Sequence, residues 1–298
     1  MIMTETAFAN IEQQVQALVG DVRNLPTPPV VFTQINRVID NEDASVYDVA
    51  GIIAEDPAMS AQVLRLANSA YYGLTNPVPH VKQAVVVLGL NEVKNVVLAA
   101  SALAAFRKSS ADIEYQDEFW RHSLAVAVTA RMLLRSFRAD KLIEAETAFS
   151  AGLLHDIGKM VIHCYAAAHY QKIRQYLKEY GGPDCRAELE VMGLDHCRIG
   201  GYLARRWKLP ADIMEAISFH HAPPATPEAG SWATIVHVAD AFAHKTFDHV
   251  EEDDHPPEIL HPEYLDRLGV SPDDFDRFKG VIIEEYAKSE TFLHMACT

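Results

Sequence analysis

A histidine and an aspartate stand side by side in an otherwise apolar segment, Leu153-Leu154-His155-Asp156-Ile157-Gly158-Lys159. Buried polar groups cost free energy unless they are hydrogen-bonded, paired or bound to a metal. Neighbouring residues on a helix point about 100° apart, so His155 and Asp156 cannot chelate one ion as an i, i+4 pair would. They could bridge two ions, or hold one together with donors from other helices. The segment therefore predicts a metal centre if other helices supply partners.

Further imidazole and carboxylate groups stand on both sides of this pair. The spacing of Glu118 and His122 is i, i+4, which places both on one helix face. The later candidates are a histidine in GLDHCRIGG, a double histidine and an aspartate among apolar residues: His196, His220, His221 and Asp240. Mixed imidazole and carboxylate sets suit ions such as iron, zinc, manganese or nickel.

Each of these residues also has a structural interpretation. A single histidine on an apolar helix face is usually a packed core residue, and the chain has 14 histidines. His220 and His221 fit a helix C-terminus, where a cationic imidazole is favourable, and Asp240 fits a cap or a partner for an arginine. Other histidines fit no constellation: His163, His169, His237, His244 and His249. Spacing alone leaves both interpretations open.

The elements that must position these side chains are helices nearly throughout the chain. Ser45 with Asp48 three positions later is a capping signature, and Asp56-Pro57 opens another helix with proline at its first position. Gly89 is predicted to hinge two helices, and Ser271 to cap a closing one. The pattern predicts an all-α, multi-helical fold.

The helical segments divide into four predicted parts. Residues 1–19 are a first helix, 20–110 an N-terminal helical subdomain, and 111–250 a metal-binding helical subdomain. Residues 251–298 are an acidic loop followed by a C-terminal helix. The proline-rich stretch 222–231 directly follows the double histidine, so it is placed to cover the site as a lid.

Composition excludes several classes of protein. The net charge of -15 argues against general binding to nucleic-acid phosphates, which requires many Lys and Arg. Residues 84–100 resemble a helix-turn-helix around Gly89, but the basic residues in and next to this stretch are only Lys82, just before it, and Lys94. No secretory signal and no long uncharged apolar run occur, and the four cysteines form no CxxC pair. We expect a cytoplasmic protein that binds neither nucleic acid nor membrane.

The ordered set H…HD…H…HH…D resembles the HD superfamily of metal-dependent phosphohydrolases, over about residues 115–245. GLLHDIGK resembles the form found in the HD-GYP branch. This resemblance implies a phosphate contact for Lys159, and implies that Glu118 is the extra carboxylate of three-metal sites. It implies metal ligation by His122, His155, Asp156, His196, His220, His221 and Asp240. The chain has HHAPPATPEAG where that branch has its Gly-Tyr-Pro segment, so cyclic di-GMP hydrolysis does not follow.

The N-terminal half resembles the HDOD domain, from LPTPPVVFTQINRVID through VKQAVVVLGLNEVKNVVLAA. The resemblance covers about residues 20–225 and implies an all-helical module of bacterial signalling proteins. Many HDOD members have lost the HD ligands and are thought to act as regulatory interaction modules. This chain resembles a member that has kept them.

Two functions follow as hypotheses. The first is a signal-transduction protein with a di- or trinuclear metal site and signalling proteins as partners. The alternative is an active metal-dependent phosphohydrolase or phosphodiesterase that acts on a nucleotide or cyclic dinucleotide. Asp156 would then bridge two ions, and Lys159 would steady the phosphate. Iron is the first choice among divalent ions, with manganese, nickel and zinc as alternatives.

Overall fold

The computed structural model describes residues 5–27, 30–39, 45–68, 74, 76–107, 112–137, 144–224, 232–247, 260–271 and 273–297. These residues form helices joined by connections, and no strand occurs among them. The predicted all-α class is therefore confirmed. The acidic stretch 251–259 and most of the predicted lid, 225–231, lie outside the described residues.

The helices follow one another along the chain as α1 (Glu5–Val19), the short 3-10 helix η1 (Val22–Asn24), α2 (Val30–Ile39), α3 (Val46–Ala54), α4 (Pro57–Ala67), α5 (Val81–Leu88), α6 (Leu90–Arg107), α7 (Ile113–Phe137), α8 (Glu144–Leu154), α9 (Ile157–Tyr165), α10 (Ala167–Tyr180), α11 (Asp184–Met192), α12 (His196–Arg206), α13 (Ala211–Phe219), α14 (Trp232–Phe247), α15 (Pro262–Leu268) and α16 (Asp274–Cys297).

The helix boundaries follow the capping residues of the sequence. The backbone N–H of Ser45 donates to the Asp48 carboxylate at 2.9 Å, and the Asp48 N–H donates back to the Ser45 hydroxyl at 3.3 Å. This reciprocal pair is the predicted capping box. Gly89 has φ +80°, a conformation that favours glycine, and the chain turns there by 112° between α5 and α6.

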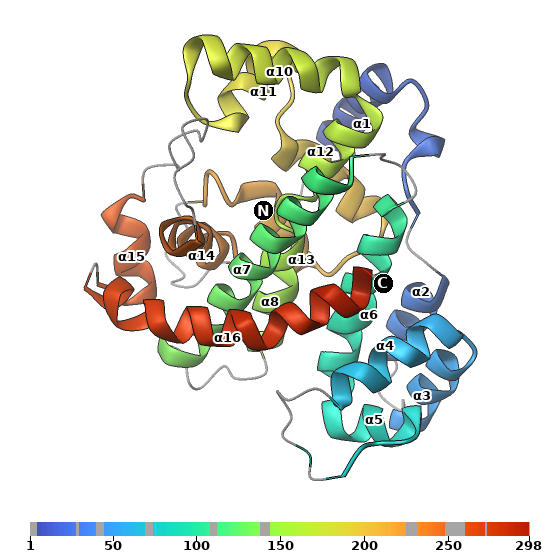
Figure 1. Ribbon diagram of the computed structural model, residues 1–298. Helices are drawn as coiled ribbons and strands as arrows, with labels where there is room; N and C mark the ends of the chain where they lie inside the picture. The colour runs from blue at the N-terminus through green and yellow to red at the C-terminus, as the bar shows by residue number, and fades with distance from the viewer. Residues whose placement is uncertain are drawn as a thin grey trace.

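The helices gather around the neighbouring pair α7 and α8 (Figure 1). Helices α2 to α6 lie together in one part of the molecule, and α16 runs across α7 to reach α4 and α6. Helix α1 packs on α12, where the Tyr202 hydroxyl donates to Glu12 at 2.9 Å. One hydrophobic cluster includes Val97 and Phe106 as well as Leu153 and Ile217. The subdomain boundary at 110/111 stays a prediction.

Glycines let α9 approach α12 closely, and this approach positions the site. A Cβ atom on Gly158 would lie 2.0 Å from the His196 carbonyl oxygen, and one on Gly200 would lie 2.8 Å from Ile217. A side chain on Gly158 would therefore require a backbone shift, whereas one on Gly200 would displace the Ile217 side chain. The glycine of the HDIGK segment therefore brings the start of α12, and with it His196, up to Asp156.

Helices α5 and α6 pack into the interior of the fold. Val93 and Val97 are buried, and the Asn95 amide donates to the Glu146 carbonyl of α8 at 2.8 Å. In the described part of the chain, no single helix is long and apolar enough to cross a membrane, although this bent pair passes by length and composition.

Candidate metal centre

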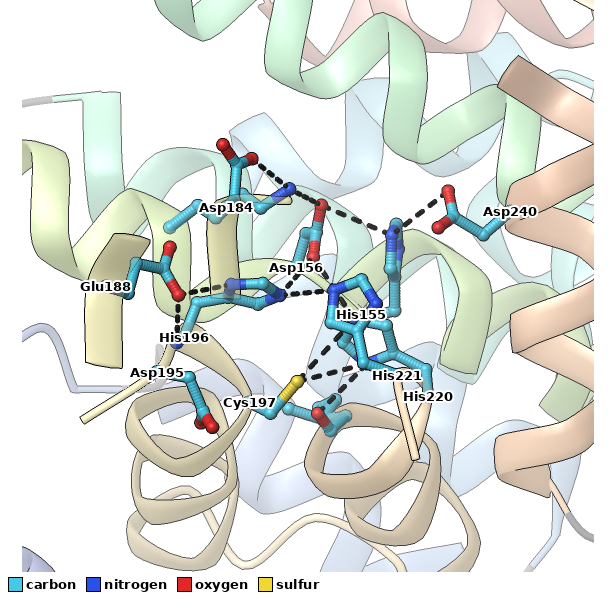
Figure 2. Close-up of polar contacts among 12 residues, drawn as sticks. His155, Asp156, Asp184, Glu188, Asp195, His196, Cys197, His220, His221 and Asp240 are labelled. Carbon is cyan, nitrogen blue, oxygen red and sulfur yellow. Dashed lines mark hydrogen bonds and ion pairs between the residues drawn. The ribbon is translucent and has the colours of Figure 1, made fainter. Parts of the chain in front are cut away.

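Three histidines from separate parts of the chain converge on the Asp156 carboxylate (Figure 2). His196 Nε2 lies 3.1 Å and His220 Nε2 3.3 Å from Asp156 Oδ1. His155 Nε2 lies 3.3 Å from the other oxygen, Oδ2. The carboxylate is 3% exposed and the three imidazoles are fully buried. The structure thus brings together residues 155, 156, 196 and 220 as the sequence predicts.

The corner between α8 and α9 directs Asp156 into this cluster. The residue has φ -96° and ψ 11°, precedes the first residue of α9, and its side chain makes no capping hydrogen bond. That backbone region is sparsely populated and is often found at active-site residues. The side chain is therefore available to the imidazoles rather than to the helix end.

Each of the three imidazoles is oriented through its other ring nitrogen. His155 Nδ1 lies 2.7 Å from the Gly152 carbonyl oxygen, and His220 Nδ1 3.1 Å from that of Ala216. His196 Nδ1 lies 2.7 Å from Glu188 Oε2. When Nδ1 donates its proton to these oxygens, the Nε2 lone pair points at Asp156, which is the arrangement typical of metal-ligating histidines.

These side chains form two neighbouring groups of donors. His155 and Asp156 are adjacent in the sequence but belong to different groups. The four-donor group comprises Asp156, His196, His220 and His221, and the three-donor group comprises His122, His155 and Asp240; within each, the donor atoms lie within 4.8 Å of one another. His122 Nε2 lies 3.1 Å from Asp240 Oδ1, and His155 Nε2 lies 3.8 Å from the same oxygen. Each group matches the imidazole and carboxylate chemistry of a divalent transition-metal site.

Three buried atoms in these groups lack a hydrogen-bond partner: His155 Nε2, Asp156 Oδ1 and Asp240 Oδ1. Most buried polar atoms in proteins have such a partner, and an orphan calls for an explanation such as an ion. All three atoms are metal-ligand types and face the other donors. The residues therefore fit a pair of divalent cations.

The charges of the site shift its pKa values in opposite directions. Burial alone would raise the pKa of Asp156, but the charges of His155 and Lys159 outweigh it and hold the pKa well below its usual range. Burial alone would lower the pKa of His220, but Cys197 and Asp156 raise it to about 10. Glu188 has the same effect on His196, whose pKa is raised well above its usual range against burial.

His122 in the three-donor group behaves differently from these two histidines. Burial lowers the pKa of His122, and the neighbouring Asp240 carboxylate only partly opposes that effect. Asp240 itself is held well below its usual pKa, because the interactions with His122 and His244 outweigh burial.

Lys159 lies at the edge of the cluster. Its ammonium is 2.8 Å from Asp156 Oδ2 and 3.1 Å from Asp184 Oδ2. Burial alone would lower the pKa of Lys159, but these two carboxylates raise it well above its usual value. The lysine is therefore a fixed cation beside the metal ligands, where a phosphate contact is predicted.

Glu118 is not brought into either group. It lies one helical turn before His122 on α7 and is exposed. No group of three or more donors found among the described residues includes it. Its ligand role stays a prediction.

Sequence reasoning missed several residues that hold the ligands. Glu188 and Asp184 on α11 carry no spacing signal, because their roles depend on how α11 folds back on α9 and α12. His244 Nε2 lies 3.5 Å from Asp240 Oδ1, and its i, i+4 spacing was a usable signal. His237 Nδ1 lies 2.7 Å from the His220 carbonyl oxygen and fixes the double-histidine turn.

Comparison with known proteins identifies the family of the chain. The HDOD domain matches residues 25–223. The chain belongs to the HDOD domain family. A solved HDOD domain protein of unknown function from Geobacter sulfurreducens has 25% sequence identity and a TM-score of 0.77, over 97% of this chain and 98% of that one.

Another solved structure, provisionally named a phosphohydrolase, comes from Shewanella amazonensis SB2B. It is 27% identical with a TM-score of 0.70, and the match covers 97% of both chains. The two folds therefore agree over nearly their whole length.

Curated relatives of this HDOD protein are longer than it is. An uncharacterized protein of Treponema pallidum is 28% identical over 74% of this chain and 43% of its own length. Ribonuclease Y of Petrotoga mobilis is 28% identical over 54% of this chain and 24% of its own. The chain thus spans less than half the length of these relatives.

Proposed function

We propose that this HDOD protein holds two divalent metal ions in its HD-like half and hydrolyses a phosphoester there as part of a signalling role. The observation that carries the proposal is that the two oxygens of the Asp156 carboxylate face different donor groups. Its Oδ1 faces His196 and His220 of the four-donor group, and its Oδ2 faces His155 of the three-donor group. One carboxylate is therefore placed to bridge two ions.

The ions would lower the pKa of a bound water towards neutrality and polarise the phosphate. The protein's own contribution is to fix the donors and the charge around them. His155, His196 and His220 are held by Gly152, Glu188 and Ala216, so their Nε2 atoms need no reorganisation to bind. Lys159 provides a fixed positive charge beside Asp156 that can orient a phosphate and stabilise charge developing on it.

The substrate class follows from the site and from the relatives. A phosphodiester, such as a nucleotide or cyclic dinucleotide, suits a buried bimetal site with one adjacent lysine. The names of the Shewanella phosphohydrolase and of ribonuclease Y support phosphoester chemistry in this fold. Iron or manganese is the proposed metal, because carboxylate and imidazole ligands accept both.

The test is hydrolysis of bis(p-nitrophenyl) phosphate, followed by a panel of nucleotides and cyclic dinucleotides, by protein loaded with Fe²⁺ or Mn²⁺ without oxygen. His155→Gln should abolish turnover, whereas His169→Gln on α10, outside both donor groups, should retain it. Lys159→Gln should keep the metal content and raise KM for the phosphodiester. Metal-loaded wild-type protein that hydrolyses none of these substrates would refute the catalytic part of the proposal.

One observation favours a second candidate, a signalling module whose metal centre is structural. The Lys159 ammonium is already held by Asp156 and Asp184, so a phosphate would have to displace a carboxylate contact. A structural centre contributes its binding free energy to folding. Under this candidate, chelation lowers Tm strongly while no substrate is turned over.

A further inference from the structure

Two thiols lie beside the four-donor group, and the proposed reaction does not use them. Cys185 is the second residue of α11 and half-buried, and Cys197 is the second residue of α12 and buried. Their sulfurs and the donor nitrogens of His196 and His221 all lie within 4.8 Å of one another. Figure 2 shows Cys197 on the side of the cluster where His220 and His221 lie.

Two cysteines and two histidines are a ligand set typical of tetrahedral zinc sites. With metal–ligand distances of about 2.0 to 2.3 Å, tetrahedral donors are separated by roughly 3.3 to 3.8 Å. The four side chains therefore need only small rotations to close around one ion. The elements that carry them are fixed: Gly193 ends α11 in the left-handed conformation, and the Asp195 carboxylate caps α12.

We propose that Cys185, His196, Cys197 and His221 form a thiolate metal position that takes Zn²⁺ in competition with the ion of the four-donor group. The competition rests on the proposed function, because it requires that the four-donor group binds an ion. The thiolate position itself does not depend on any hydrolytic activity.

The two positions exclude each other because they share two histidines. His196 Nδ1 donates to Glu188, so Nε2 is its one available lone pair, and this atom lies 2.9 Å from His221 Nε2. A neutral imidazole gives one lone pair to one ion. An ion that draws both Nε2 atoms towards the sulfurs therefore removes two of the four donors from the Asp156 side.

Ligand softness decides which ion takes which position. Thiolates favour zinc, whereas a carboxylate with imidazoles accepts manganese and iron, and zinc binds more tightly than either in the usual affinity order. Zinc should therefore empty the four-donor group and leave the three-donor group, which shares neither histidine, filled. The device would make the centre respond to the ratio of zinc to manganese or iron.

The experiment adds one equivalent of Zn²⁺ to manganese-loaded protein. Zinc X-ray absorption reports the ligands, and the paramagnetic resonance signal of free Mn²⁺ reports displacement. We expect two sulfur neighbours at about 2.3 Å and one manganese released per zinc bound. Zinc with only nitrogen and oxygen neighbours, or sulfur ligation with no manganese release, would overturn the thiolate position or the competition, respectively.

Serine variants test whether the sulfur neighbours of zinc are Cys185 and Cys197. The double variant Cys185→Ser/Cys197→Ser should show no sulfur neighbour, while Cys164→Ser, at a half-buried cysteine on α9 outside the donor groups, should behave as wild type. If the double variant does not fold, Cys185→Ser alone should show one sulfur neighbour. Should the wild type hold no manganese, the proposed function fails, yet zinc added alone still decides the thiolate position by the same sulfur signal.

Discussion

The two donor groups of the metal centre differ in burial and in protonation. His196 and His220 of the four-donor group are fully buried, and both have raised pKa values, about 10 for His220. His122 of the three-donor group is 21% exposed by its side chain, and its pKa is lowered. An ion entering the four-donor group must therefore displace protons, whereas an ion at His122 meets a neutral imidazole. Adjacent sites built from the same residue types therefore differ in protonation because the residues around them differ.

The largest expected effect is at Asp156, the residue that faces both groups. Asp156→Asn removes the bridging charge, so both ions should be lost and phosphodiester hydrolysis should fall below detection. The loss should exceed the roughly 10- to 100-fold weakening that follows removal of an outer-shell partner. Elemental mass spectrometry gives the metals per chain, and Asp212→Asn, an exposed aspartate on α13, serves as the matched control. A variant that keeps two ions would show that Asp156 does not bridge.

A smaller effect is expected at His122, because it belongs to one group only. His122→Gln should lower the metal content by one ion per chain and leave the four-donor group loaded. Elemental analysis after gel filtration measures the stoichiometry, with His169→Gln as control. Loss of both ions would mean that the two groups bind cooperatively and are not separable in the way proposed.

Glu188 should act on the four-donor group alone. Glu188→Gln removes the charge that orients His196 through a 2.7 Å contact, and outer-shell losses of this kind weaken metal binding by roughly 10- to 100-fold. Competition with a fluorescent chelator measures the affinity of each ion. Glu190→Gln, at an exposed position on the same helix, should have no effect. If Glu188→Gln weakened metal binding equally at both groups, Glu188 would not act on the four-donor group alone.

The smallest expected effect is a pH dependence of metal binding, which arises from protons released when an ion binds. Because the pKa values of His196 and His220 are raised, metal-free protein carries protons there near neutral pH, and each must leave when an ion binds. Affinity at the four-donor group should therefore rise with pH, by up to about tenfold per pH unit for each proton released. Calorimetry in buffers of different ionisation enthalpy should detect this release in His122→Gln. It should be nearly absent in His196→Gln, where only the three-donor group is intact.

Much of this site could be predicted from the sequence, because its ligands stand out as polar groups within apolar helices. His155, Asp156 and Asp240 stand out in this way, and the resemblance to the HD superfamily adds His196 and implies that all four are ligands. The structure places each in one of the two groups. Capping signals such as Ser45 with Asp48 also fixed helix boundaries locally. Local patterns of this kind predict the structure correctly because they depend on a few neighbouring residues and not on how the helices pack.

The supporting contacts could not be predicted in the same way. Glu188 meets His196, and Cys185 comes close to Cys197, only because α11 and α12 meet at the Gly193 corner. The sequence predicts Gly158 only as part of a helix, yet its lack of a side chain determines how closely α9 approaches α12. Such contacts depend on the crossing of helices, which the spacing of residues along the chain does not encode.

The most direct test of the central claim is a count of metals in protein purified without a histidine tag, without added metal and in low oxygen. The account predicts two divalent ions per chain, iron or manganese, by elemental mass spectrometry. Protein that is free of metal, stays folded and takes up no ion on titration would contradict it. His155 and Asp156 would then be a hydrogen-bonded core pair rather than the centre of a metal site.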